Sequence, residues 1–408
     1  MGQKGAALDM NGSHMKFAIL LGDGMADQAL PELSGRTPLQ AASTGSMDAL
    51  AARGRLGMAT TVPPGFPAGS DVANLSVMGY DPRRYYSGRA PLEAAAMGVP
   101  LKDGDIAFRC NLVTVQDGRM ADYSAGHISS AEGAEIIRSL RHLVPGERLY
   151  PGVSYRHLAV LEDGAKAKCT PPHDITGQPF RKFLPRGPGG EILKDIMDRA
   201  APILASHPVN SRRVSEGKRP ANMIWLWGQG PAPSMPRFRQ LYGRDGAVIS
   251  AVDLLKGIGI YAGMEVVDVP GATGTIDTDY EGKVEGACRA LHNVDVVYLH
   301  VEAPDEAGHA GDLDQKIEAI ELFDCRVVGP MVEALEASGH PWRVLLMPDH
   351  PTPIPLRTHT AEPVPFLMAG EGIAPDRCRS FDEVAAKDGG FGLVEGFELM
   401  GRMLGRHD

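Results

Sequence analysis

Short apolar runs alternate with longer amphipathic stretches at both ends of this chain. Four of the runs are predicted to be buried strands, at residues 17–21, 294–301, 342–347 and 365–368. Two of the stretches have the residue types and apolar spacing of helices, at residues 37–53 and 313–335. Strands that alternate with helices favour an α/β fold with a mostly parallel sheet.

The middle of the chain has a different composition. Residues 185–190 (PRGPGG) and 228–236 (GQGPAPSMP) are rich in proline and glycine, which interrupt helices and strands. We therefore expect residues 99–250 to form a smaller domain that is inserted into the first. The flanking residues, 15–98 and 251–408, are expected to form one discontinuous domain around the predicted strands.

Acidic residues follow three of the predicted strands. Asp23 comes after the first run, Asp305 after the second, and Asp349 with His350 after the third. In parallel α/β sheets the active site forms beyond the carboxyl ends of the strands. These side chains are hundreds of residues apart in sequence, yet we expect them to converge at one edge of the sheet.

The spacing around these acids predicts a metal site. Asp305 and His309 are four residues apart, so a helical turn would place both on one face. His350 and His359 add two imidazoles. Carboxylates mixed with imidazoles suit Mn²⁺ or Zn²⁺ better than Ca²⁺. The alternative is that these residues belong to unrelated polar turns. Their positions after successive predicted strands disfavour that alternative.

Ser70 is a candidate nucleophile between small residues. It lies in PAGSDVANLS, where Asp71 and the residues after it are suited to begin a helix whose backbone N–H groups would face an anion. A serine hydroxyl is a poor nucleophile at neutral pH, and a bound metal would activate it. Taken alone, the Gly69-Ser70-Asp71 sequence more often caps a helix, so the nucleophile hypothesis depends on the metal ligands.

Charge and cysteine usage restrict the partners. The formal net charge of -10 argues against nucleic acid, since binding a phosphate backbone requires clustered basic residues. The five cysteines are odd in number and widely spaced, as expected for reduced thiols. No apolar run approaches the ~18 residues of a transmembrane helix, and the first 14 residues lack the apolar segment of a secretory signal. We expect a cytoplasmic protein with no membrane partner.

Several segments resemble one known family in their order along the chain. The resemblance is to cofactor-independent (2,3-bisphosphoglycerate-independent) phosphoglycerate mutases of the archaeal type, within the alkaline phosphatase superfamily. It extends from about residue 16 to near the C-terminus. The segments are LLGDGMAD (20–27), PAGSDVANLSVMGYDP (67–82), YSGRAPLEAAAMGV (86–99), PDEAGHAGD (304–312), MPDHPTP (347–353) and RTHTAEPVPF (357–366).

The resemblance implies an alkaline-phosphatase-like fold, with a mostly parallel sheet sandwiched by helices and an inserted smaller α/β (α+β) domain. It also implies a phosphoserine intermediate on Ser70 and two divalent ions, Mn²⁺ first, with Mg²⁺, Co²⁺ or Zn²⁺ as alternatives. One ion would be held by Asp23, Ser70, Asp349 and His350, and the other by Asp305, His309 and His359.

In this family the inserted domain binds the rest of a small phosphorylated substrate. His127, in SAGHIS, resembles the family's substrate histidine, and Arg156, in SYRHL, resembles a substrate arginine. His157, which stands where larger relatives carry an aspartate, is a third candidate substrate residue.

The resemblance leaves two activities open. The first is interconversion of 3-phosphoglycerate and 2-phosphoglycerate. The second is a homoserine kinase-like phosphotransfer in threonine synthesis, which some bacterial relatives are proposed to perform. A non-catalytic binding module is the third class, and it is disfavoured because all seven family-matched metal positions hold competent ligands.

Overall fold

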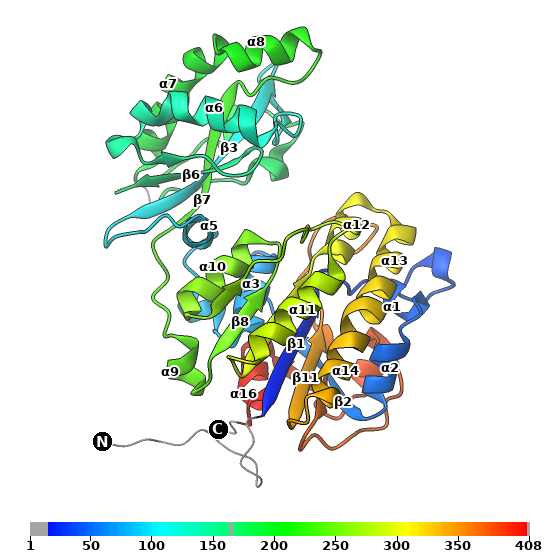
Figure 1. Ribbon diagram of the computed structural model, residues 1–408. Helices are drawn as coiled ribbons and strands as arrows, with labels where there is room; N and C mark the ends of the chain where they lie inside the picture. The colour runs from blue at the N-terminus through cyan, green and yellow to red at the C-terminus, as the bar shows by residue number, and fades with distance from the viewer. Residues whose placement is uncertain (1–14, 163–165, 406–408) are drawn as a thin grey trace, which may run out of the picture. The chain divides into compact units, whose positions relative to one another are not determined.

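The computed structural model describes residues 15–162 and 166–405 (Figure 1). The predictions made for the first 14 residues lie outside this part of the chain. The structure divides into two compact units, one formed by the chain up to Tyr86 and from Met235 onwards, the other by Ser87–Ser234. An inserted unit is therefore present, and both of its boundaries lie earlier in the sequence than the predicted 99 and 250.

Two elements account for the difference between the predicted and the observed boundaries of the inserted unit. The predicted boundaries place helix α5 (Ala90–Ala96) in the discontinuous domain, but this helix packs against strands of the inserted unit. The same boundaries place strand β8 (Gly246–Ile249) in the inserted domain, but β8 pairs in parallel with β10 (Val296–Val301) of the large sheet. Short elements beside a linker belong to whichever core they cover, and the linker composition alone does not reveal this.

The larger unit is built on a sheet of eight strands in the described residues, in the order β13-β2-β12-β11-β1-β10-β8-β9. Only β12 runs antiparallel to its neighbours, so the prediction of a mostly parallel sheet is confirmed. The strands not yet bounded are β1 (Lys16–Gly22), β2 (Gly54–Thr60), β9 (Glu265–Val267), β11 (Trp342–Met347), β12 (Val364–Gly370) and β13 (Leu393–Glu395).

The centre of the sheet is the apolar core of this unit. Strand β1 lies between β10 and β11, and Leu20 pairs with Leu299 on one side and Leu346 on the other. All three leucines are buried. Strands covered on both faces are expected to be apolar at nearly every position, which accounts for the unbroken runs in the sequence.

Helices cover both faces of this sheet (Figure 1). The large core is completed on one face by α2, α11, α13 and α14, and α3, α10 and α16 lie on the other face. Their bounds are α2 (Gly45–Ala51), α3 (Ser70–Val77), α10 (Asp253–Ala262), α11 (Tyr280–Leu291), α13 (Leu313–Phe323), α14 (Gly329–Ala337) and α16 (Leu399–Met403).

The two predicted helices are interrupted. Residues 37–53 form α1 (Pro38–Ala41) and α2 with a break between them. Residues 313–335 are helical throughout, but a π-helical segment at Asp324–Val328 separates α13 from α14. The Asp324 carboxylate accepts the backbone N–H groups of Ser46 and Met47, so the π segment places an acceptor at the start of α2.

The inserted unit has an antiparallel sheet in which β3 (Ile106–Gln116) pairs with three neighbours. Phe108, Cys110 and Leu112 of β3 point into a core that is closed by α6 (Ser130–Leu140) and α7 (Gly190–Ala205). The other strands and helix of this unit are β4 (Arg119–Asp122), β5 (Leu149–Tyr150), β6 (Arg156–Leu161), β7 (Met223–Gly230) and α8 (Pro208–Ser215).

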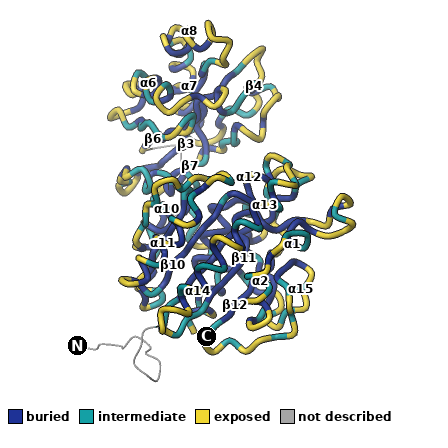
Figure 2. The backbone as a smooth tube through the Cα atoms, turned by 45° about the vertical axis from the view of Figure 1, so that its right-hand side comes forward, coloured by how far each residue is buried: buried dark blue, intermediate teal, exposed yellow. Residues whose placement is uncertain are grey.

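Burial follows the strands of each unit (Figure 2). The central strands are buried along most of their length, and exposed positions gather on loops and on the outer faces of helices. No helix in the described residues is long and apolar enough to cross a membrane.

Candidate active site

The acidic strand ends converge as predicted. Asp23 directly follows β1, Asp349 and His350 follow β11, and Asp305 lies in α12 (Ala303–Ala310), which begins just after β10. Because β1 lies between β10 and β11 and runs parallel to both, the three ends meet at one edge. The backbone N–H of Gly24 reaches across and donates to Asp349 Oδ1 at 3.1 Å.

Asp349 is the most firmly held of these carboxylates. It is fully buried and accepts three hydrogen bonds, from the N–H groups of Gly24 and His350 and from the side-chain amide of Asn74 at 2.7 Å. Asn74 is itself oriented by Tyr298, whose hydroxyl donates to Asn74 Oδ1 at 2.6 Å. Hydrogen bonds from several fixed donors hold a carboxyl group in one orientation.

Asp23 has one oxygen that the protein does not satisfy. Its Oδ2 lies 2.9 Å from Nε2 of His300, while Oδ1 has no hydrogen-bond partner among the described residues. Burial, with added repulsion from Asp349 and Asp305, raises the pKa of Asp23 well above its usual range. A buried, unpartnered carboxylate oxygen beside other carboxylates is costly unless a cation neutralises it.

Asp305, His309 and His359 form a second group. Both imidazole Nε2 atoms face the Asp305 carboxylate, at 3.3 Å from His309 and 3.4 Å from His359, and they lie 2.8 Å from each other. Burial opposes the charged form of Asp305, but hydrogen bonds from the two histidines outweigh it and hold its pKa well below the usual range. For His309, burial is likewise outweighed by Asp305, which raises the imidazole pKa to about 9.

His350 presents an accepting ring nitrogen to the same site. Thr352 donates its hydroxyl hydrogen to Asp305, so the Nδ1 of His350, 3.3 Å from that hydroxyl, carries the hydrogen of this contact. The Nε2 atom of His350 then has a lone pair, and it lies 3.5 Å from Asp23 Oδ1. Burial lowers the pKa of His350, which favours the neutral ring that a metal requires.

These side chains fit divalent metal ions. Three groups have ligand atoms within 4.8 Å of one another, and they contain all six predicted Asp and His ligands together with His300, which the sequence did not suggest. The unpartnered Asp23 oxygen and the facing imidazoles are the features that a cation would satisfy. The groups are Asp305-His309-His359, Asp23-Asp305-His350 and Asp23-His300-Asp349.

Ser70 lies at the edge of this cluster. It is the first residue of α3, one residue before the predicted start at Asp71, and its Oγ is 3.1 Å from His350 Nε2. The Asn74 amide donates to the Ser70 carbonyl at 2.9 Å as well as to Asp349. A single side chain therefore fixes the position of Ser70 relative to a candidate metal ligand. The arrangement places a hydroxyl at a helix N-terminus, where an anion is favoured.

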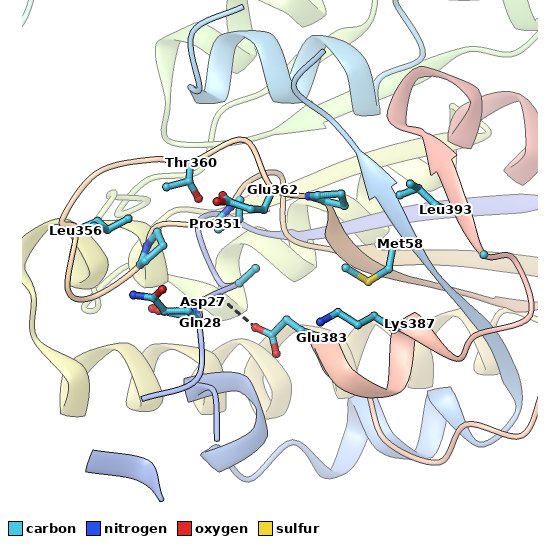
Figure 3. Close-up of a pocket in the computed structure, with 14 residues that line it drawn as sticks. Asp27, Gln28, Met58, Pro351, Leu356, Thr360, Glu362, Glu383, Lys387 and Leu393 are labelled. Atoms are coloured by element: carbon cyan, nitrogen blue, oxygen red, sulfur yellow. Dashed lines mark hydrogen bonds between the residues drawn. The ribbon is translucent and has the colours of Figure 1, made fainter. Parts of the chain in front are cut away.

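A pocket of about 600 Å³ lies beside the segment that carries His359 (Figure 3). Pro351, Leu356 and Thr360 of this segment form one wall, with Asp27 and Glu383 nearby, joined by a hydrogen bond from the Asp27 N–H. The segment is therefore bordered on this side by a pocket.

A buried lysine connects this segment to the site. Lys316 is fully buried and donates to Asp27 at 2.7 Å and to the carbonyl of Thr352 at 2.8 Å. The Thr352 hydroxyl in turn donates to Asp305. A buried ammonium group is stable only when it is paired, so this network fixes Thr352 relative to α13 and β1.

The predicted residues of the inserted unit do not all lie together. His127 and Arg156 are exposed and both contact the Tyr155 ring, His127 with its centroid 6.2 Å away and the Arg156 guanidinium at 5.9 Å. His157 is the next residue of β6, so it points to the opposite face. It is buried, accepts the Gly152 N–H, and has its pKa lowered to about 3 by burial.

Sequence reasoning passed over one further residue of this unit, on the face of β3 that α5 covers. Arg109 and Asn111 are two apart on β3, and Asn111 pairs with Arg156 across the sheet. The guanidinium of Arg109 stacks 4.4 Å from the Trp227 ring and pairs with Glu93. An arginine inside an apolar strand segment gives no local sequence signal of which face it occupies.

The fold and the site define an α/β protein with a cluster of carboxylates and imidazoles, a candidate metal site, at the carboxyl edge of its sheet. Residues 51–210 match the family model described as 2,3-bisphosphoglycerate-independent phosphoglycerate mutase. A protein of that name from Methanothrix thermoacetophila is 65% identical over 95% of this chain and 98% of its own length. A probable 2,3-bisphosphoglycerate-independent phosphoglycerate mutase from Geobacter sulfurreducens is 54% identical over 96% of this chain and 100% of its own.

Solved structures agree with this relationship. The PH0037 protein from Pyrococcus horikoshii superposes with a TM-score of 0.81 at 31% identity, covering 97% of this chain and 99% of that one. The cofactor-independent phosphoglycerate mutase from Thermoplasma acidophilum gives a TM-score of 0.63 at 27% identity, covering 96% and 99%. The chain belongs to the family of 2,3-bisphosphoglycerate-independent phosphoglycerate mutases, and the resemblance inferred from its motifs is confirmed.

Proposed function

We propose that this chain interconverts 3-phosphoglycerate and 2-phosphoglycerate by way of a phosphoserine at Ser70. The observation that carries the proposal is the position of the Ser70 hydroxyl, at the N-terminus of α3 and 3.1 Å from His350 Nε2, at the edge of a buried set of carboxylates and imidazoles. The names of the relatives, which share more than half of the sequence, support the choice of substrate.

Two divalent ions would be held by this site. Asp23, Ser70, Asp349 and His350 would bind one, and Asp305, His309 and His359 the other, with Mn²⁺ the first choice over Mg²⁺, Co²⁺ or Zn²⁺. When bound, such ions make a serine hydroxyl a better nucleophile and offset the charge of a transferring phosphoryl group.

The chain's own residues would carry the transfer in two halves. Ser70 Oγ loses its proton as it attacks phosphorus, the bond from phosphorus to the substrate oxygen breaks, and that oxygen takes up a proton, so that glycerate is left without net change in protons. After glycerate reorients, its other hydroxyl attacks the phosphoserine and Ser70 is regenerated. Backbone N–H groups in the first turn of α3 favour the phosphoryl oxygens, and water must be excluded because it would hydrolyse the intermediate.

Substrate binding is assigned to the inserted unit. His127 and Arg156 are exposed there and carry the donors that a carboxylate or phosphate requires. His157 stays a predicted substrate residue, and its buried ring is suited to hold the Gly152 turn that precedes Arg156. A cytoplasmic location accompanies the proposal, since none of the five cysteines forms a disulfide in the described structure.

The proposal is tested by a Ser70→Ala variant with Ser76→Ala as its control. Both serines are buried in α3. Ser70 Oγ lies 3.1 Å from His350 Nε2, whereas the Ser76 hydroxyl has no hydrogen-bond partner to lose among the described residues. In an enolase-coupled assay with Mn²⁺ and no added bisphosphoglycerate, Ser76→Ala should retain turnover and Ser70→Ala should lose nearly all of it.

Acid-quenched wild-type protein should also carry phosphate on the peptide that contains Ser70. Phosphate on a histidine, or near-normal turnover by Ser70→Ala, would refute the mechanism. Turnover of homoserine with ATP in place of phosphoglycerate would favour the kinase activity instead.

A further inference from the structure

His300 is a fully buried histidine at the edge of the site that neither half of the proposed mechanism uses. It lies near the end of β10, and its side chain is 0% exposed. Its two ring nitrogens face two different residues, Asp23 after β1 and Ser250 directly after β8. The contact therefore joins the ends of three strands that are neighbours in the sheet.

The hydrogen bonds around His300 assign its ring proton. The Ser250 hydroxyl accepts the N–H of Val252 at 3.0 Å and lies 3.3 Å from His300 Nδ1, to which its own hydrogen can be donated. With Nδ1 as the acceptor, Nε2 carries the proton and donates it to Asp23 Oδ2 at 2.9 Å. The order of donation is backbone N–H, serine, histidine, aspartate.

A buried lysine fixes the strand at this residue. Lys283 is buried and donates to the backbone carbonyl of His300 at 3.1 Å, which anchors the strand at this residue. In the order of donation given above, His300 has one proton to give, and the hydrogen bond to Asp23 uses it.

We infer that His300 is a positioning residue, whose N–H occupies Oδ2 of Asp23 so that Oδ1 alone faces the metal ions. The inference rests on the metal site proposed above. Asp23 Oδ1 is the oxygen without a hydrogen-bond partner in the described chain, and His350 Nε2 approaches it to 3.5 Å. Asp23 then binds through one oxygen, and the orientation of its carboxylate is set before any ion arrives.

The competing role for His300 is that of a direct ligand. Its ring lies within 4.8 Å of ligand atoms of Asp23 and Asp349, a grouping that could hold an ion. A ligating Nε2 would have to present a lone pair to the ion, and Asp23 Oδ2 would lose its donor. The two roles make opposite demands on the Nε2 proton, so variants that differ in that donor separate them.

The experiment uses the full chain, with Mn²⁺ binding followed by calorimetry and metal content measured after dialysis. His300→Leu removes the donor at similar volume, and His300→Gln restores an N–H at a comparable reach. His300→Leu should weaken one of two Mn²⁺ sites about 10- to 100-fold, the usual effect of losing a partner of a metal ligand, with two ions still bound at saturation. His300→Gln should stay within roughly threefold of wild type, because the hydrogen bond is retained.

Ser250→Ala is the matched control for the outer end of this chain of donors. It leaves the ring and Asp23 in place, so Mn²⁺ affinity should fall only by a factor of about three, as for one lost neutral hydrogen bond. If His300→Leu does not fold, as judged by circular dichroism, His300→Gln and Ser250→Ala still decide the matter.

The outcomes separate this inference from the proposed function. A wild-type chain that binds no divalent ion would refute the proposed function itself. A wild type with two ions and an unchanged His300→Leu would overturn only the positioning role. Loss of one ion in His300→Gln would overturn it as well, and would make His300 a ligand.

Discussion

The candidate metal ligands fall into two groups that are supported in different ways. The strand group, which is Asp23, Asp349 and His350, follows β1 and β11 directly and is 0–1% exposed. The other, the helix–loop group, is Asp305, His309 and His359; its two histidine side chains are 35% and 16% exposed.

The difference comes from what lies behind each group. Asp349 is held by two backbone N–H groups and the Asn74 amide, all inside the protein. His309 contacts a loop carbonyl, that of Arg357, and His359 belongs to a segment that lines the pocket in Figure 3 rather than a packed core. The strand group is fixed before metal binds, whereas the helix–loop group depends more on the ion for its order.

The largest expected effect separates the two groups by stability. In the metal-free protein, Asp349→Ala strands three buried donors and should lower the free energy of unfolding by about 3 kcal/mol or more. His309→Ala removes a partly exposed side chain, and at about pH 9, where the stabilising charge of its imidazole is lost, we expect a loss of about 1 kcal/mol or less. Urea denaturation of both variants gives the comparison, and equal losses would show that the groups are equally built into the fold.

The second prediction concerns the order in which metal is lost. Because the helix–loop group is more exposed, a chelator should remove its ion first, leaving a species with one ion on the strand group. We expect the two dissociation constants to differ by at least about tenfold. Metal content measured against chelator concentration should show two steps, and His309→Ala should abolish the easier one. Loss of both ions in a single step would contradict this order.

The third prediction is a pH dependence of opposite sign in the metal-free protein. The folded-state pKa of His309 is raised to about 9 from 6.5, so its contribution to stability is present below pH 6.5 and lost as pH rises towards 9. The pKa of His350 is lowered, so stability is lost at this position as pH falls below 6.5.

Paired variants measure these two slopes. The stability difference between wild type and His309→Gln should shrink between pH 6.5 and 9, since the raised imidazole pKa is what the variant removes. For His350→Gln, the wild-type advantage should instead shrink as pH falls below 6.5. If the wild-type advantage over both variants changed with pH in the same direction, the two groups of ligands would not differ in their electrostatics.

The strand group was predictable from sequence, and the reason is periodicity. A short apolar run that ends in an acid places that acid at a strand end, and parallel strands bring their ends together. His300 was missed because it lies inside such a run, where the pattern assigns it to the strand interior. Its contact with Asp23 depends on the neighbouring order of β1 and β10, which no local pattern contains.

Other features depended on tertiary contacts in the same way. Strand β12 was expected in a mostly parallel sheet, and its antiparallel direction is set by the long loop that carries His359 back across the site. His157 was grouped with Arg156 by motif, yet alternation along β6 turns it into the core. A motif gives residue types, and the face that each residue occupies follows from the strand it joins.

Thr352 is the link between the two groups, and its replacement is expected to have the smallest effect on metal binding among these predictions. Its hydroxyl donates to Asp305 of the helix–loop group and lies 3.3 Å from Nδ1 of His350 in the strand group. Lys316 holds the Thr352 backbone carbonyl, so the residue stays in place when the hydroxyl is removed. Thr352→Val should therefore keep the fold, losing about 1–2 kcal/mol of stability as expected for a buried hydroxyl that bonds a charged group.

The informative readout for Thr352→Val is metal binding. Without the shared hydroxyl, Asp305 and His350 no longer orient each other. An ion bound to one group should then increase the metal affinity of the other group less. Mn²⁺ titrations should show both sites retained, with the affinity of the second reduced by a factor of about three to ten, the equivalent of one such hydrogen bond. Thr352→Ser, which keeps the hydroxyl, should bind both ions as wild type does. If Thr352→Val binds them equally well, the two groups act independently and the contrast between them is one of exposure alone.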